Sequence, residues 1–437
     1  NTSDPDMALN NWERFTRQLP DRSAFFRELL SQPRRLELML KVFAGSQFLS
    51  DTLIQNPHFL SWITNPRVVL RRRDQRVMGS ELTEGAPSEN RREWLNRLRS
   101  YRKREILRIG TKDICLGQDF LEIVTEISAL ARSIISAAFD HIVATLTPPE
   151  REVAERITIL AFGKLGGREL NYSSDIDLLL AYEPAGDRRS DFGSRTGAKI
   201  LQRLVRDLTD FTDQGKAYRV DLRLRPYGDS GEVVNSVDQL LTYYGSRAGL
   251  WELQALIKLS PVAGNLELGW SLLERTKPLF VDRIREAGGR EAIVSGIREM
   301  RSKAVSKYRS EAPDVKNGVG GIRDIEFIAQ GLQMIHARYY PEALTGSTLM
   351  ALSKLEEGGV LDSGTVSELK GDYIFLRRIE HFLQVYEDRQ LDTIPADPGA
   401  RGTLARLVLG PDEDAVEFET HLHLVLTRVR GAFDQLL

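Results

Sequence analysis

The sequence contains one cysteine and has almost no net charge, and each shortage excludes a class of protein. The lone Cys115 cannot form a disulfide within the chain, so we expect a protein of a reducing compartment, the cytoplasm. Zinc sites built from several cysteines are excluded, and the six histidines are not spaced as metal ligands. A net charge of −2 over 437 residues argues against nucleic acid or an anionic membrane as a partner.

Long apolar runs are also absent. No stretch of 18 or more consecutive apolar residues occurs, so we expect no transmembrane helix. Residues 1–10 show neither a basic and apolar signal peptide nor an initiator methionine. We therefore expect no leader, and a chain that is trimmed or excerpted from a longer one.

What is present favours helix. Charged residues make up 28% and apolar residues 41% of the chain, with arginine, glutamate and leucine abundant. At about 150 residues per domain, the length suggests two or three domains. Apolar residues recur at helical spacing before residue 150 and again after residue 265. We predict a predominantly helical α+β protein with a helical region at 1–150, a catalytic α/β region at 151–265 and a helical bundle at 266–437.

The middle region predicts a small mixed sheet. Runs at 156–162, 175–183 and 217–228 are rich in β-branched and apolar residues, so we expect three strands there. Segments 68–90 and 185–196 are polar and predict loops, and 197–212 predicts an amphipathic helix.

Two aspartates stand at the start of the second of these strands. Asp175 and Asp177 are two residues apart, so their side chains point to the same face. Aspartate is depleted in strands, and two on one face of an apolar strand need compensation, which a divalent cation supplies. Asp221, on the third expected strand, is a further candidate. The three carboxylates predict a Mg²⁺ site for chemistry at phosphorus; the alternative is that Asp175 and Asp177 end a turn.

Residues around the aspartates suit phosphate. Glycines in a turn let backbone N–H groups approach phosphate oxygens, serine hydroxyls add contacts, and arginines that alternate with Asp221 share its face. The alternative for the arginines is charge balance for the aspartates. The candidates are Gly166, Gly167, Ser173, Ser174, Arg223 and Arg225.

A second polar patch lies in the stretch DVKNGVGGIRDIEF. A glycine-rich bend before a helix is an anion-binding candidate, here with Lys316 and Arg323. Asp324 and Glu326 are candidates for the same site or for capping the helix. Glu252 and Lys258, in the stretch WELQALIK, are expected on a solvated, salt-bridging helix face.

These motifs together resemble a known family. The glycine pair, the Ser-Ser-Asp-x-Asp stretch and the later strand aspartate look like the nucleotidyltransferase superfamily that includes DNA polymerase beta. The closer resemblance is to the bifunctional glutamine synthetase adenylyltransferase/adenylyl-removing enzymes, and it covers nearly the whole chain. The motifs that carry it are GKLGGRELNYSSDIDLL, YRVDLRLRPYGDSG, LWELQALIKLSPVAG, DVKNGVGGIRDIEFIAQ and FLRRIEHFLQ.

The resemblance implies a fold and a reaction. The family joins two homologous halves: one removes AMP from a tyrosine of glutamine synthetase by phosphorolysis, which releases ADP, and the other adds AMP from ATP. It implies a polymerase-beta-like sheet, Mg²⁺ on Asp175, Asp177 and Asp221, and the PII signal protein as regulator. This chain carries one motif set. Its ELNYSSDID resembles the removing half, whereas the adding half tends to show ELGYSSDLD.

Other readings stay open. The chain would alternatively be the adding half, a catalytically silent module that binds glutamine synthetase or PII, or an RNA-terminal nucleotidyltransferase. The carboxylate trio argues against the silent module, and the net charge of −2 argues against RNA. Family members commonly show Lys-Ala-Arg-Pro where this chain has residues 258–261 as Lys-Leu-Ser-Pro, so a phosphate-binding arginine is missing there.

Overall fold

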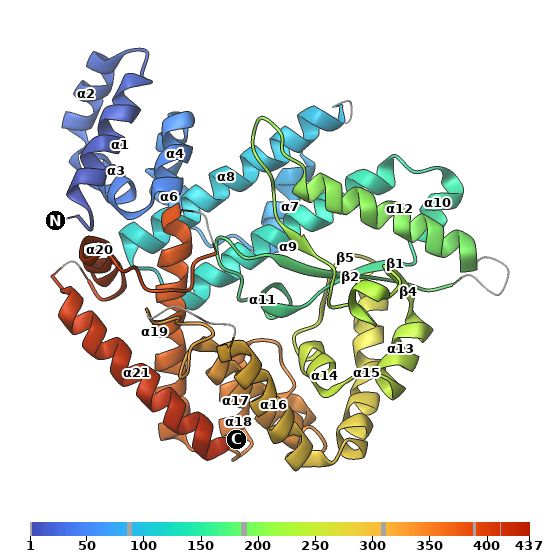
Figure 1. The fold of residues 1–437 in the computed structure, drawn as a ribbon. Coiled ribbons are helices and arrows are strands. Elements are labelled where there is room, and N and C mark those ends of the chain that lie inside the picture. Colours follow the sequence, from blue (N-terminus) through green and yellow to red (C-terminus); the bar gives the residue numbers. More distant parts are fainter. Residues whose placement is uncertain (1, 85–89, 185–189, 307–311, 388–389, 411) are drawn as a thin grey trace.

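The structure is a computed structural model, and it describes every residue except 1, 85–89, 185–189, 307–311, 388–389 and 411. Within the described residues, helices surround one five-stranded sheet (Figure 1). The strands are β1 (Ile157–Ala161), β2 (Ile176–Tyr182), β3 (Val220–Asp221), β4 (Val234–Ser236) and β5 (Ser260–Gly264). The prediction of a predominantly helical α+β fold with a small mixed sheet is confirmed.

The sheet is mixed, and one edge of β2 is shared by two short strands. β1 lies between β2 and β5 and runs antiparallel to both. β3 pairs in parallel with the start of β2, and β4 pairs in parallel with its end. The chain between β3 and β4 therefore leaves the sheet at the point where β2 begins.

The third strand is much shorter than the sequence predicted. A strand over 217–228 was expected, but only Val220–Asp221 pairs with β2. The Asp221 carboxylate accepts a hydrogen bond from the backbone N–H of Arg223 at 2.8 Å, which turns the chain. Tyr227 then takes the left-handed conformation with φ of +61°. Side-chain hydrogen bonding to the backbone competes here with strand pairing.

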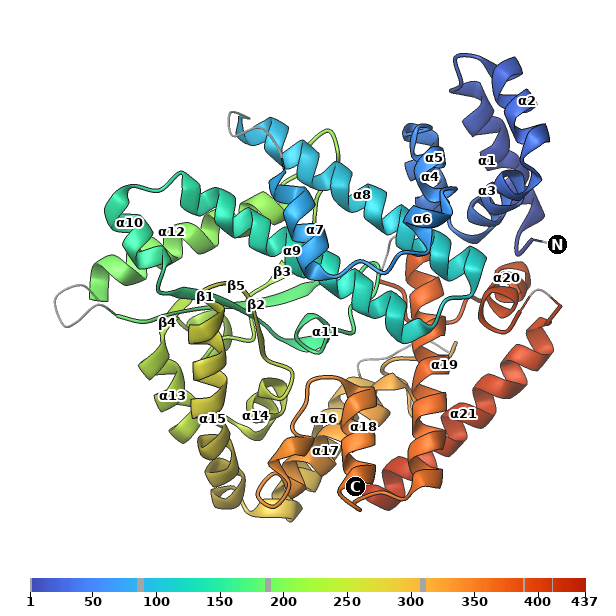
Figure 2. The same cartoon turned by 180° about the vertical axis from the view of Figure 1, so that it is seen from behind.

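Helices cover both faces of the sheet. α9 (Phe120–Ala144) and α12 (Ser190–Thr209) lie on one side, and α13 (Val237–Ser246) and α15 (Leu266–Glu286) on the other (Figures 1 and 2). All five residues of β1 are buried as a result. Among the described residues, α9 alone is long and apolar enough to cross a membrane by those two criteria, and 67% of its apolar window is buried inside the protein. That burial is the pattern of a core helix.

The remaining helices precede the sheet, connect its strands or follow it. Before it come α1 (Pro5–Arg17), α2 (Arg22–Ser31), α3 (Pro33–Gly45), α4 (Gln47–Gln55), α5 (Phe59–Ile63), α6 (Pro66–Val69), α7 (Gln75–Thr83) and α8 (Arg91–Leu116). Between strands or beside them are α10 (Pro148–Ala154), α11 (Gly163–Gly166) and α14 (Leu250–Leu256). After it come α16 (Gly289–Ser306), α17 (Ile322–His336), α18 (Thr348–Glu357), α19 (Ser363–Glu387), α20 (Pro398–Val408) and α21 (Ala415–Leu436).

Two predicted loops contain helix. Segment 68–90 includes α7, because Asp74 caps its first turn by accepting from the Val77 N–H at 2.9 Å. Met78 and Leu82 then bury one face of this helix. α12 begins at Ser190, inside the other predicted loop. Residues 85–89 and 185–189 of these loops lie outside the described residues.

The ends of the chain pack against each other. Arg406 on α20 donates to the Ser3 carbonyl oxygen at 2.6 Å, and the Ser46 hydroxyl before α4 donates to the Val385 carbonyl on α19 at 2.5 Å. The blue and red helices accordingly meet in Figure 1. The predicted boundaries near residues 150 and 265 stay predictions, and α9 and α15, on their far sides, pack on the sheet.

Candidate active site

The structure brings the three predicted aspartates together. Asp177 on β2 and Asp221 on β3 are directly paired in the parallel register. Asp175 immediately precedes β2, and all three line one cavity. Asp177 is the one position of β2 that is only partly buried, since the other six residues pack beneath the helices. The expectation from strand alternation therefore places the carboxylates correctly.

The three carboxylates differ in how their negative charge is balanced by neighbouring groups. Burial, followed by the negative charges of Asp221 and Asp175, raises the pKa of Asp177 to about 6. Arg223 donates to both Asp221 oxygens, at 2.6 and 2.9 Å to Oδ2 and at 3.1 Å to Oδ1, and this hydrogen bonding lowers the pKa of Asp221. Arg219 pairs with Asp175. Within the described residues, no lysine or arginine forms an ion pair with Asp177.

This donor set fits a hard divalent cation. Carboxylate oxygens are the ligands that Mg²⁺ prefers, and a half-buried carboxylate without an ion-pair partner, Asp177, is the group that such a cation would neutralise. In the described part of the chain, no three His, Cys, Asp or Glu side chains are arranged around one point as metal ligands. Asp221 and Asp175 are held by Arg223 and Arg219 instead. Metal binding by Asp221 would require Arg223 to leave, because Arg223 occupies both of its oxygens, whereas Arg219 contacts only Oδ1 of Asp175.

The cavity in front of the aspartates has a volume of about 840 Å³. Its wall combines the turn after β1, the starts of β2 and β3, and faces of α14, α16 and α17. Basic side chains surround the acidic centre, which suits phosphate groups. They are Lys164, Arg223, Lys258, Lys303, Lys316 and Arg323.

The glycine-rich patch at 314–326 faces this cavity, with Lys316 and Arg323 in its lining. The turn needs glycine at Gly320, where φ is +80° and a Cβ would lie 2.0 Å from the Leu426 carbonyl oxygen. Asp324 accepts from the Gly320 N–H at 2.7 Å and from Arg301, so it ties the glycine bend to the first turn of α17, whereas the N-cap residue Gly321 has no side-chain cap. The sequence thus located this segment correctly.

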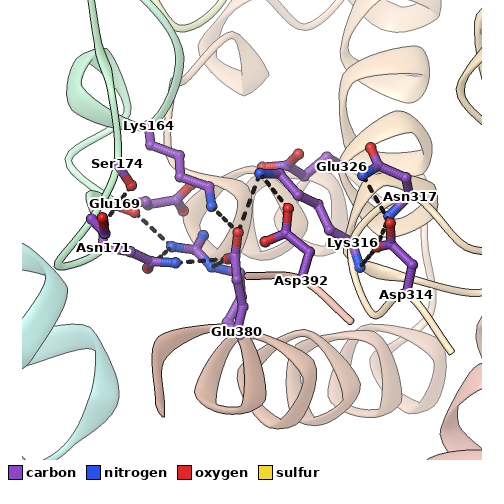
Figure 3. A network of polar contacts seen from close by, with 12 residues as sticks. Lys164, Glu169, Asn171, Ser174, Asp314, Lys316, Asn317, Glu326, Glu380 and Asp392 are labelled. Carbon is purple, nitrogen blue, oxygen red and sulfur yellow. Dashed lines mark hydrogen bonds and ion pairs between the residues drawn. The ribbon is translucent and has the colours of Figure 1, made fainter. Parts of the chain in front are cut away.

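Lys316 belongs to a charged network that the C-terminal helices complete. Glu380 on α19 accepts from Lys164, and Lys316 lies 3.5 Å from the same carboxylate and 3.2 Å from Asp392 (Figure 3). Arg377 pairs with Glu380 at 3.1 Å, so three cations face two carboxylates. Burial lowers the pKa of Lys164 to about 8. Glu326, whose pKa Lys164 and Arg377 also lower, brings further negative charge to this network beside the cavity.

Lys258 contradicts the prediction of a solvated helix face. It is buried, and its ammonium group lies 3.0 Å from Glu326 and 3.3 Å from Glu169. Burial alone would lower its pKa, but these two carboxylates raise it overall, and Lys258 lowers the pKa of Glu326 to about 2. Glu326 therefore pairs rather than caps. Glu252 accepts from the Tyr243 hydroxyl at 2.6 Å, away from these groups.

The predicted phosphate-binding glycines serve packing instead. A Cβ on Gly166 would lie 1.8 Å from the Lys258 carbonyl oxygen, and one on Gly167 would lie 2.4 Å from that of Gly346. Both line a second cavity, of about 1210 Å³, and not the one with the aspartates. The glycine beside the carboxylates is Gly163, with φ of +57° and a would-be Cβ 2.7 Å from Asp177 Oδ2. The sequence offered one signal that could have located Gly163 in the site, namely its position directly after the first predicted strand.

Of the other predicted residues, two line the cavity and two do not. Ser174 and Arg223 are in its wall. Ser173 is buried, and its carbonyl oxygen accepts from Arg219. Arg225 donates to the Leu222 and Gly231 carbonyl oxygens at 2.8 and 3.1 Å, which holds the turn after β3. The predicted strand alternation does not extend to Arg225, because β3 ends at Asp221, although the pKa of Asp221, lowered mainly by Arg223, is also lowered by the charge of Arg225.

A small mixed sheet that presents three aspartates to a cavity bordered by basic side chains is the arrangement of a nucleotidyltransferase. Comparison with family models agrees: residues 36–275 match glutamate-ammonia ligase adenylyltransferase, and residues 294–437 match GlnD PII-uridylyltransferase. Since the first match covers more than half of the sequence, the chain belongs to the glutamate-ammonia ligase adenylyltransferase family.

Curated relatives carry the same family name at greater length. The chain is 31% identical to the bifunctional glutamine synthetase adenylyltransferase/adenylyl-removing enzyme of Alteromonas mediterranea, over 92% of this chain and 43% of the relative. Proteins of that name from Thioalkalivibrio sulfidiphilus and Shewanella loihica are 33% and 31% identical, over 92% and 98% of this chain and 42% and 45% of theirs. The chain thus spans less than half the length of these relatives.

Proposed function

We propose that this chain removes AMP from an adenylylated tyrosine of glutamine synthetase by phosphorolysis. A phosphate oxygen attacks the phosphorus of the AMP ester, the bond from phosphorus to the tyrosine oxygen breaks, and ADP leaves. The released phenolate takes a proton from water. The observation that carries the proposal is the register pair of Asp177 and Asp221 in a cavity bordered by lysines and arginines.

The charged groups divide this work. Asp175, Asp177 and Asp221 would hold Mg²⁺, which neutralises phosphoryl charge when bound. Lys316 and Arg323 bind the incoming phosphate, which carries its own anionic oxygens and needs no strong general base. Arg223 is within reach of the same oxygens once it leaves Asp221.

The choice of the removing half is supported by Asn171, the asparagine of ELNYSSDID. Its amide nitrogen donates to Glu380 at 2.7 Å, and its amide oxygen accepts from Arg377 at 2.7 Å. A glycine, as the adding half tends to have here, has no side chain to make these bonds to α19. The match of residues 294–437 to PII-uridylyltransferase points the same way. PII is accordingly the regulator we propose.

The second candidate is the adenylyl-adding reaction, in which AMP passes from ATP to the tyrosine with loss of pyrophosphate. The names of the relatives cover both reactions, which favours keeping it. The same aspartates and cations would serve, because both reactions displace a group at the same phosphorus.

One paired experiment separates the candidates. One tube holds the chain, adenylylated glutamine synthetase, Mg²⁺ and phosphate, and ADP release is measured. The other holds unmodified glutamine synthetase and ATP labelled in its AMP part. Phosphate-dependent ADP release, lost in Asp177→Asn, supports the proposal. Label transfer without ADP release supports the adding half, and inactivity of the folded chain with and without PII contradicts both.

A further inference from the structure

Three helices bring apolar and amide side chains to one part of the cavity wall, beside the charged Lys303, Arg323 and Glu326 of the same helices. The residues recur three or four positions apart, so each helix presents one face to the cavity. α14, α16 and α17 also pack on one another, which joins the three faces. The residues are Trp251 and Gln254 on α14, Met300 and Ala304 on α16, and Phe327 and Gln330 on α17.

Two glutamines of this wall form an incomplete hydrogen-bonding pair. Gln254 Nε2 donates to Gln330 Oε1 at 2.6 Å, which ties α14 to α17. Gln254 is 6% exposed, yet its Oε1 is buried and accepts no hydrogen bond in the described part of the chain. Gln330 Nε2 donates none to the described residues either. A buried polar atom without a partner is costly. Oε1 itself is covered by protein atoms, so a ligand would reach it once the Gln254 side chain turns toward the cavity that it lines.

An exposed aromatic ring stands on the same helix face as the unpaired amide oxygen. Trp251 is 48% exposed and lines the cavity three residues before Gln254. A large ring open to solvent within a concave site provides a stacking surface for a planar ligand. Together with the free acceptor of Gln254 and the free donor of Gln330, the wall fits a flat heterocycle with a donor next to an acceptor.

We propose that this wall recognises the adenine base of the nucleotide. The base stacks on Trp251, Gln254 Oε1 accepts from the exocyclic amino group, and Gln330 Nε2 donates to the adjacent ring nitrogen. Adenine offers this donor and acceptor on either edge. Hypoxanthine and guanine carry a carbonyl oxygen in place of the amino group. Two acceptors, this oxygen and Gln254 Oε1, would then face each other. The assignment rests on the proposed function, since it supplies the base-specific part of AMP binding.

The experiment compares the Kd of ADP with that of inosine diphosphate (IDP) by titration calorimetry on the full chain with Mg²⁺. The two ligands share ribose and diphosphate, so their ratio reports the base alone. We expect ADP to bind the wild-type chain at least about tenfold more tightly. Gln254→Leu should raise the Kd of ADP about tenfold and leave that of IDP within about twofold.

Further variants distinguish a loss of base recognition from a loss of the folded state. Gln330→Glu keeps an acceptor for Gln254 and replaces the donor by a carboxylate oxygen; its negative charge weakens both anionic ligands alike, and loss of the donor should bring the ratio toward one. Trp251→Ala should weaken both ligands by similar factors, because stacking does not distinguish the bases. Gln202→Leu, at an exposed glutamine of α12, should keep the wild-type ratio. Thermal melts identify folded variants.

The outcomes separate this inference from the proposed function. Equal affinity of the wild-type chain for ADP and IDP, or a wild-type ratio in both folded glutamine variants, overturns the adenine site even where ADP release is observed. The expected ratios without phosphate-dependent ADP release support the adenine site and contradict the proposed reaction. Binding of neither ligand to the folded chain overturns the adenine site.

Discussion

Asp177 is held where the folded protein disfavours its charge. Its neighbours on β2 are buried, Asp221 is its register partner, and its pKa is raised to about 6. An unfolded aspartate titrates at about 3.9. The folded state therefore loses stability from this group as the pH rises through about 6, and it loses none below about 4, where the carboxyl is protonated in both states. Such a cost at the centre of a cavity is typical of a functional group.

Asp177→Asn should abolish turnover and stabilise the fold. Each pKa unit corresponds to about 1.36 kcal/mol, so the free energy of unfolding should rise by up to about 3 kcal/mol at pH 7. The gain should vanish at pH 4. Urea unfolding in EDTA at both pH values measures it, with Asp282→Asn as the control at an exposed surface pair. A variant that is less stable than wild type at pH 7 would contradict this account.

The residue positions that the sequence placed correctly were those set by local spacing. Alternation placed Asp175 and Asp177, and a glycine-rich bend placed Lys316. Lys258 was misplaced because its partners, Glu169 and Glu326, come from distant segments that only the fold brings together. The Gln254 and Gln330 pair, 76 residues apart, was missed for the same reason.

At the scale of elements, the turn of α11 is held by close backbone approach. Gly166 packs against the backbone at the end of β1 and at Lys258, where a Cβ would lie 2.5 Å from Ala161 O and 1.8 Å from Lys258 O. Backbone cannot yield as a flexible side chain does. Apolar patterning predicted β1, β2 and the place of β3, but it missed the short strands β4 and β5, which lie in a region predicted to be helical. It also missed the early end of β3, because a side-chain turn at Asp221 decided it.

Gly166→Ala should therefore destabilise the protein strongly, by several kcal/mol, and separate α11 from α14. Gly79→Ala is the matched control on α7, where nothing lies within 4 Å of the added Cβ. It should stabilise the chain by about 0.5–1 kcal/mol through helix propensity. Chemical denaturation of both variants gives the comparison. Similar, small effects would show that the close approach of α11 is not a constraint on the fold.

At the scale of the whole molecule, the sheet depends on helices that lie outside the middle region. α9, from before residue 150, packs on β5, and α15, from after residue 265, packs on β1 and β5. Glu169 lies in the loop between α11 and β2. Its side chain accepts from the Thr348 N–H at 2.7 Å, and its carbonyl oxygen accepts from Arg377 at 2.6 Å. The C-terminal helices therefore stabilise the loop that leads to the aspartates.

A fragment of residues 151–265 should consequently fail to fold, because the buried strand β1 would lose α15, and β5 would lose both α9 and α15. A fragment of residues 118–288 restores α9 and α15 and should recover near-ultraviolet circular dichroism and a cooperative transition. Its melting midpoint should lie below that of the whole chain, since Glu169 loses its partners on α18 and α19. Cooperative, native-like melting of 151–265 alone would show instead that the sheet is an independent domain and that the predicted boundaries are physical ones.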